Sequence, residues 1–142
     1  MLVQWHKRPL IVRRFRLVYR VIRRKKRRTT RSISPLYLKN KEATRVLVLS
    51  RIEHFNQFYL QKIGRVSIRN QKTRWGSCSR KGNLNFNYRL SLVSPHLADY
   101  VIVHELCHLI EFSHSKTFWA LVAKTIPDYA ERRAQLRKIR LS

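Results

Sequence analysis

Residues 104–108 read His-Glu-Leu-Cys-His, which is the pattern H-E-x-x-H. On a helix, positions i and i+4 lie on one face about one turn apart, so His104 and His108 can reach one Zn²⁺ at about 2.0–2.1 Å. Glu105 lies roughly 100° further around the helix and can take a proton from an attacking water and pass it to the leaving group. The spacing therefore predicts a zinc hydrolase with Glu105 as general base.

The residues around this motif favour a metal over an ordinary helix face. The two histidines interrupt an apolar stretch that runs from Tyr100 to Ile110. Buried imidazoles without a metal would lose their hydration and leave polar atoms to satisfy.

A third ligand is expected from either Glu111 or His114. Glu111 lies on the same helix face, but its Cα would be about 10.5 Å from that of His104, so three side chains in one row converge poorly. His114 follows the expected helix end and can approach from another direction, leaving the open fourth position that catalytic zinc needs. His114 is therefore favoured, and Asp128 and Glu131 are remote candidates.

The offset from His104 to His114 is the ten-residue offset of metzincins. Those proteases place Gly where this chain has Glu111, and no Gly lies nearby. The turn at residues 112–113 must therefore be made in another way, which argues against a true metzincin.

The motif needs a helix, and local signals supply one. Ser94 and Pro95 are typical of an N-cap and first helical position, and the helix is expected to continue to about Phe112. Ser113 or Ser115 is expected to cap the next helix, which Pro127 ends.

Other elements are expected on both sides of this helix. Apolar residues at helical spacing predict a helix over residues 41–63, with Asn40 as N-cap and Gly64 as the stop. Short strands are expected near residues 66–68, 73–78 and 84–87, with a turn at 80–83. A basic amphipathic helix is expected over residues 129–139.

Several segments in this order resemble the YgjP-like metallopeptidase family, a zincin-like group distantly similar to the SprT and WLM proteases. The resemblance covers roughly residues 40–140. It rests on Thr73-Arg-Trp-Gly-Ser-Cys78, Asn85 to Leu90, Tyr100-Val-Ile-Val-His-Glu-Leu-Cys-His-Leu109, His114-Ser115 and Phe118-Trp119.

The resemblance implies an α+β, zincin-like fold in which a small antiparallel or mixed sheet packs beside the HExxH helix and further helices. It also implies zinc at His104, His108 and His114, with Glu105 as general base. Family members usually have a longer β-rich segment before the first helix. Here residues 1–39 are short and basic, so we expect an N-terminal arm and a metallopeptidase domain over 40–142.

The segment 74–78 and the strand at 85–87 have two interpretations each. Arg74 can bind a substrate carboxylate or phosphate through its planar guanidinium, and Cys78 can approach the metal or the substrate. Alternatively, Trp75 is core, Gly76 allows a bulge and Cys78 is a small buried residue. Asn85 and Asn87 are candidate substrate contacts if residues 85–87 form an edge strand that pairs with a peptide; ordinary sheet pairing is the alternative.

Charge and composition suggest partners and a compartment. The net charge is +25, and residues 1–32 hold 13 of the 32 Lys and Arg but none of the seven acids. Residues 23–28 are an unbroken basic run, and a nucleic-acid contact there is one hypothesis beside a solvated tail. Two cysteines and the lack of an apolar run of about 20 residues favour a cytoplasmic protein without a transmembrane segment.

Three functions are consistent with these patterns. The favoured one is hydrolysis of peptides or proteins by a zinc metallopeptidase. The second is zinc-dependent hydrolysis of nucleotides or phosphate esters, which the basic surface and Arg74 motivate. The third is a basic nucleic-acid-binding module with a vestigial metal site, in which affinity falls steeply with salt.

Overall fold

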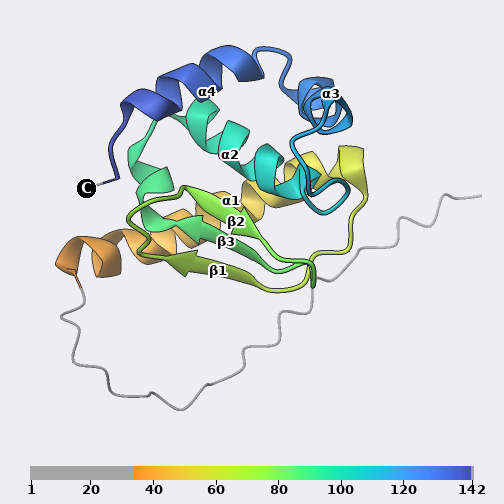
Figure 1. Cartoon of the computed structure of the whole chain (residues 1–142). Coiled ribbons are helices and arrows are strands. Elements are labelled where there is room, and N and C mark those ends of the chain that lie inside the picture. Colours follow the sequence, from red (N-terminus) through yellow and green to blue (C-terminus); the bar gives the residue numbers. More distant parts are fainter. Residues whose placement is uncertain (1–33, 142) are drawn as a thin grey trace, which may run out of the picture.

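A computed structural model describes residues 34–141 of the chain (Figure 1). The order of elements is α1 (Pro35–Tyr59), β1 (Val66–Arg69), β2 (Gly76–Cys78), β3 (Leu84–Asn87), the 3₁₀ helix η1 (Tyr88–Leu92), α2 (Pro95–Cys107), α3 (Lys116–Thr125) and α4 (Tyr129–Lys138). Residues 1–33 of the expected arm, including the basic run at 23–28, lie outside the described residues. No helix in the described range is long and apolar enough to span a membrane.

Helix α1 differs from its prediction at both ends. It begins at Pro35, with Ser34 as N-cap, so the same Ser-Pro signal that starts α2 also starts α1. Residues 35–39, predicted as arm, are therefore the first turns of this helix. It ends at Tyr59 because Leu60 adopts a left-handed φ of 53°, and the side chain of Asn56 binds the backbone of Gln61.

The three strands form a mixed sheet with the order β1-β3-β2. β1 pairs in parallel with β3, and β2 pairs antiparallel with β3. Of the two interpretations of residues 85–87, ordinary sheet pairing is therefore correct and an edge strand is wrong, because β3 lies between β1 and β2. Among the strands of the described residues, β2 lies at an edge of the sheet. The parallel pairing requires residues far apart in the chain, which no local pattern reveals.

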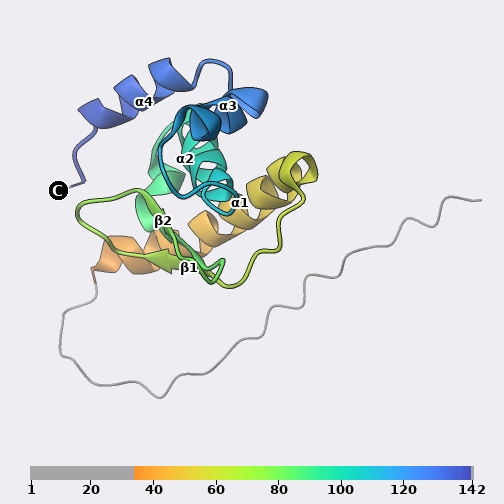
Figure 2. The same ribbon diagram turned by 45° about the vertical axis from the view of Figure 1, so that its right-hand side comes forward.

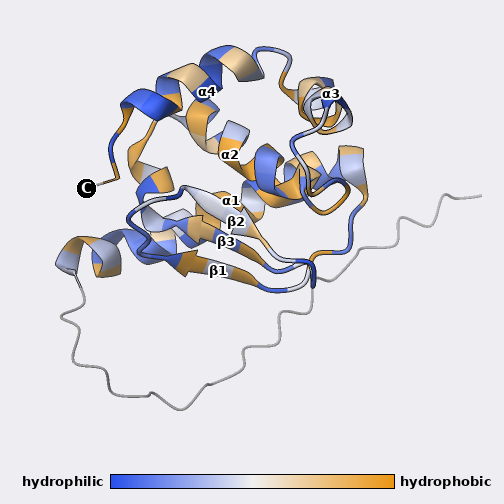
Figure 3. Cartoon of the chain, viewed as in Figure 1, coloured by the Kyte–Doolittle hydropathy of each residue, from blue (hydrophilic) through white to orange (hydrophobic). Residues whose placement is uncertain are grey.

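Helix α2 is the centre of the core. Its residues are apolar around nearly the whole circumference, which is typical of a buried helix, and it packs against α1, β2, α3 and α4. Figures 1 and 2 show α2 between the sheet with α1 on one side and α3 with α4 on the other. Figure 3 shows hydrophobic residues along most of α2 and more hydrophilic ones along α4.

Polar contacts fix α1 to its neighbours. The hydroxyl of Thr44, which is fully buried, donates to the carbonyl of Tyr88 at 2.6 Å. Arg51 binds the carboxylate of Asp99 on α2 through two nitrogens, at 2.6 and 2.7 Å. Because α1 is anchored in this way, it provides a rigid support for the helix that carries the H-E-x-x-H motif.

Candidate metal centre

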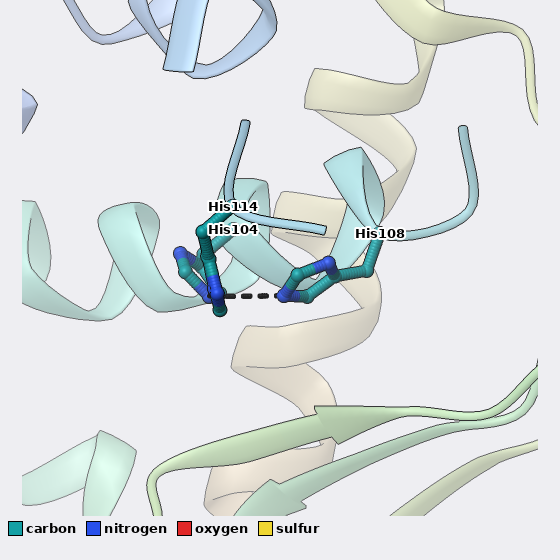
Figure 4. Close-up of side chains that lie close together, drawn as sticks. All are labelled: His104, His108 and His114. Carbon is teal, nitrogen blue, oxygen red and sulfur yellow. Dashed lines mark hydrogen bonds between the residues drawn. The ribbon is translucent and has the colours of Figure 1, made fainter. Parts of the chain in front are cut away.

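Three histidine side chains converge at the C-terminal end of α2. The Nε2 atom of His104 lies 3.2 Å from that of His108 and 3.1 Å from that of His114. One nitrogen from each ring lies within 4.8 Å of the others. Figure 4 shows the rings of His104 and His114 beside each other and His108 pointing toward them from the end of the helix.

The loop after α2 brings His114 back to the motif. The helix ends at Cys107, five residues before the predicted end at Phe112. The carboxylate of Glu111 accepts hydrogen bonds from the backbone N–H and the hydroxyl of Ser113, at 2.8 and 2.7 Å. These hydrogen bonds stabilise the tight turn after α2, which this chain makes without a glycine. They also engage Glu111, the alternative third ligand, whereas His114 reaches the cluster.

The ring of His108 is held in the orientation that a ligand needs. Its Nδ1 atom donates to the backbone carbonyl of Glu111 at 3.1 Å, so Nε2 is left to face the cluster. Metal-binding histidines usually donate the other ring nitrogen to such an acceptor. The early end of α2 is therefore useful to the site, because it places this carbonyl beside the imidazole.

An aromatic layer fixes the three rings from the side of α3. Phe118 is fully buried, and its ring centroid lies 4.5 Å from that of His108 and 4.8 Å from that of His114. Trp119 stacks on His114 at 5.6 Å and on Tyr129 at 5.1 Å. Ser115 caps α3, as one of the two predicted candidates, by accepting from the N–H of Phe118.

The donor set fits a zinc ion. Tetrahedral zinc with Zn–N bonds of about 2.0–2.1 Å places neighbouring nitrogens roughly 3.3–3.4 Å apart, close to the separations of 3.2 and 3.1 Å in the structure. Burial, and then the proximity of His108 and His114, lower the pKa of His104 to about 3. Burial also lowers the pKa of His108. Neutral imidazoles are the form that binds a metal.

Glu105 lies beside this cluster on the same helix and is only 6% exposed. Burial raises the pKa of its carboxyl to about 8, and the positive charge of Arg74 partly opposes that increase. The carboxyl packs against the backbone of Gly76 in β2. A Cβ atom at Gly76 would lie 2.6 Å from the Oε1 atom of Glu105. Gly76 has no positive φ, so its importance is close approach and not backbone freedom.

The remaining candidates have different surroundings. The Asn87 side chain is fully buried, donates to the carbonyls of Gln71 and Arg74, and accepts from the N–H of Arg89. These bonds are those of a structural residue. Asn85 contacts Ser77 on β2, at 3.2 Å.

Arg74 and Cys78 lie close to Glu105. Arg74 is exposed, and its charge acts on the Glu105 carboxyl. Burial, and then the charge of Glu105, raise the pKa of the Cys78 thiol to about 11. Cys78 is therefore a protonated thiol near neutral pH, and it is absent from the group of side chains that could hold a metal.

Comparison with known proteins agrees with this geometry. The YgjP-like metallopeptidase domain family matches residues 4–139. The chain belongs to the YgjP-like metallopeptidase family. The match begins at residue 4, so it is longer than the stretch of 40–140 expected from motifs and includes most of the segment predicted as an arm. Membership of a metallopeptidase family, together with the histidine triad, implies a metal ion at this site.

A solved structure supports the fold of this family member. The chain is similar to the metallopeptidase zymogen abylysin of Pyrococcus abyssi, with a TM-score of 0.60 and 26% sequence identity. The similarity covers 64% of this chain and 92% of that one. No curated protein sequence matches the chain. The expected zincin-like α+β fold is thus confirmed.

Three features of the site were not expected from the sequence. These are the contact between Gly76 and Glu105, the stacking of Trp119 on His114, and a basic cleft beside the triad that includes Arg133 and Arg137. The i, i+4 spacing of the two arginines was a visible signal. Which surface the two arginines face depends on how α4 packs, and the spacing alone does not show that.

Proposed function

We propose that this chain hydrolyses peptide bonds with a zinc ion held by His104, His108 and His114. The observation that carries the proposal is the convergence of three imidazole nitrogens beside a buried carboxyl on the same helix. Glu105 is then the general base.

The metal and the carboxyl have separate parts in this reaction. When bound, zinc supplies a Lewis acid that polarises the scissile carbonyl and lowers the pKa of water toward about 7. Glu105 takes the proton of the attacking water and delivers it to the leaving amine. Burial raises the pKa of the Glu105 carboxyl, whereas the charge of Arg74, and that of a metal ion when bound, would favour the ionised carboxylate that this first step requires.

The position of β2 favours a peptide as the substrate. Within the described residues β2 pairs with β3 along one edge and lies against α2, which carries the histidines. An extended peptide can add to the other edge through backbone hydrogen bonds, which brings a peptide bond to the metal centre. β2, in place of residues 85–87, is therefore the strand that we propose pairs with a peptide.

Phosphate-ester or nucleotide hydrolysis is the second candidate function. The exposed guanidinium of Arg74 beside Glu105, and the basic cleft next to the triad, are the observations that favour it. Zinc polarises a phosphoryl group as it does a carbonyl, so the two functions use the same residues and differ in what the surface binds.

The test measures metal content and activity in matched variants. We expect Glu105→Gln to retain about one zinc per chain but to lose cleavage of unstructured peptides, because it removes the base and leaves the ligands intact. His108→Ala should lose the metal. His96→Ala is the control, because His96 lies on the surface and contacts Gln135 far from the triad.

Three outcomes would contradict the proposal. Full zinc retention in His108→Ala would refute the assignment of ligands. Undiminished peptide cleavage by Glu105→Gln would remove the general base. Cleavage of nucleotides but of no peptide by the zinc-loaded wild type would favour the second function.

A further inference from the structure

Two clefts open beside the ends of β2. The first has a volume of about 370 Å³ and includes Gly76, at the start of the strand, together with His104 and Glu105. The second has a volume of about 430 Å³ and includes Ser79, just after the strand, and Phe112. Phe112 stacks on His108. The clefts therefore flank the metal centre along the edge strand that the proposed function assigns to the substrate.

The first cleft has an apolar floor and a basic rim. Apolar side chains from the loop before β2, from α2 and from the C-terminal segment form the floor: Trp75, Val101, Leu136, Ile139 and Leu141. Lys72, Arg133 and Arg137 supply three exposed positive charges around them. The Arg133 guanidinium lies 4.8 Å from the ring centroid of Trp119, which holds its charge near the triad.

The second cleft is also basic. Lys62, Arg80 and Lys81 line it together with Leu109 and Phe112. All three cations are exposed. The N–H of Gly82 donates to the carbonyl of Ser79, which closes the turn that carries Arg80 and Lys81. A substrate leaving β2 in this direction therefore meets a group of positive charges.

These six cations lack carboxylate partners within residues 34–141. The ion pairs in that range join Arg45 to Glu42, Arg51 to Asp99 and Arg132 to Asp128. Glu105 is the one acid that lines either cleft in the described part of the chain. The six cations outnumber this single buried carboxyl and are available to an anionic ligand.

We propose that the site selects peptides with acidic side chains on both sides of the cleaved bond. This inference rests on the proposed peptidase function. The clefts are separated by the length of β2, roughly 10 Å, because three residues of strand each rise about 3.3 Å. An extended substrate would cross that distance in about three residues, so acidic side chains within a few positions of the scissile bond reach the two rims.

A polypeptide suits these clefts better than a nucleic acid. The floor of the first cleft buries apolar side chains, and apolar and acidic residues alternate readily along an extended peptide whose side chains point to opposite faces. A nucleic acid would place phosphates at every step and leave the apolar floor unmatched.

The experiment measures binding separately from cleavage. Full-length zinc-loaded Glu105→Gln is titrated into two fluorescent peptides of the same length, followed by fluorescence anisotropy. One has an apolar centre flanked by Asp and Glu, and the other has Asn and Gln at those positions. We expect about tenfold tighter binding of the acidic peptide at low salt, since exposed charge pairs are each worth up to about fivefold.

Charge-reversal variants test where the preference arises. In the Glu105→Gln background, Arg133→Glu with Arg137→Glu should weaken binding of the acidic peptide about tenfold and that of the amide peptide little. Lys138→Glu with Arg140→Glu is the matched control, because both residues are exposed at the end of the same segment and line neither cleft. For the second cleft, affinity for the acidic peptide is measured in Lys81→Glu and in Lys39→Glu, a control on α1 that lines neither cleft. Only Lys81→Glu should weaken it.

The outcomes separate this inference from the proposed function. Equal affinity for the two peptides, or an equal loss in both charge-reversal pairs, would overturn the acidic preference and indicate a general effect of net charge. An oligothymidylate of equal charge that binds more tightly than the acidic peptide and loses affinity in the Arg133/Arg137 pair would assign the clefts to nucleic acid. Site-dependent acidic preference without cleavage by the wild type would support the inference and refute the peptidase proposal.

Discussion

Gly76→Ala should impair catalysis by displacing Glu105. The added Cβ would lie 2.6 Å from Oε1, 2.7 Å from Cγ and 2.9 Å from Cδ of that residue. Ordinary contact begins at 3.4 Å, so the carboxyl must move by about 0.8 Å. Misplacement of a catalytic group by about 1 Å can cost roughly 10²-fold in rate. We therefore expect a fall of about 30- to 100-fold in kcat/KM for a fluorogenic peptide.

The metal should stay in place in this variant. The three atoms nearest to the added Cβ all belong to Glu105, and the three histidines contact Phe118, Trp119 and the Glu111 carbonyl. Zinc content by mass spectrometry should therefore equal that of the wild type. Ser77→Ala is the control, because it changes the neighbouring residue of β2 and removes one contact with Asn85.

A double-mutant cycle tests the cause. In the Glu105→Gln background Gly76→Ala should lower the residual activity little further, because the displaced group has already lost its function. An unchanged kcat/KM in Gly76→Ala would refute the steric argument. So would an equal fall in both backgrounds, because the effect would then not pass through Glu105.

Three further predictions concern metal binding, stability and polyanions. His114→Ala should bind zinc at least tenfold more weakly by competition with a chelator, and the chelator should lower the Tm of the wild type but not of this variant; equal shifts in both would exclude His114 as a ligand. Arg51→Ala should reduce the free energy of unfolding by about 1–2 kcal/mol in urea titrations, because it breaks a half-buried two-nitrogen ion pair with Asp99; a midpoint equal to the wild type would show that this pair does not fasten α1 to α2. Replacing the basic residues 23–28 by glutamine should lower affinity for duplex DNA and flatten its dependence on salt, since fewer counterions are released, with zinc content unchanged; an unaltered salt slope would remove that run from the nucleic-acid hypothesis.

The helices near the motif were predictable because their signals are local. Ser94 with Pro95 and Ser115 mark the starts of α2 and α3 at the expected places. The i, i+4 spacing placed His104 and His108 on one face, and the position of His114 after the expected helix end favoured it as the third ligand. The end of α2 was placed five residues too late, because the periodic pattern does not show where the loop must turn.

The sequence by itself determined that this chain carries an H-E-x-x-H helix with a third histidine in reach and a family resemblance built on several ordered segments. Only the tertiary structure decided that β3 is central, that Asn87 is structural, that Gly76 admits the Glu105 carboxyl, and that the cations of α4 face the cleft. The physical reason is the distance along the chain between the residues that interact. Helical spacing and capping depend on residues a few positions apart, whereas strand order, close backbone approach and the direction of exposed charges depend on how distant segments pack.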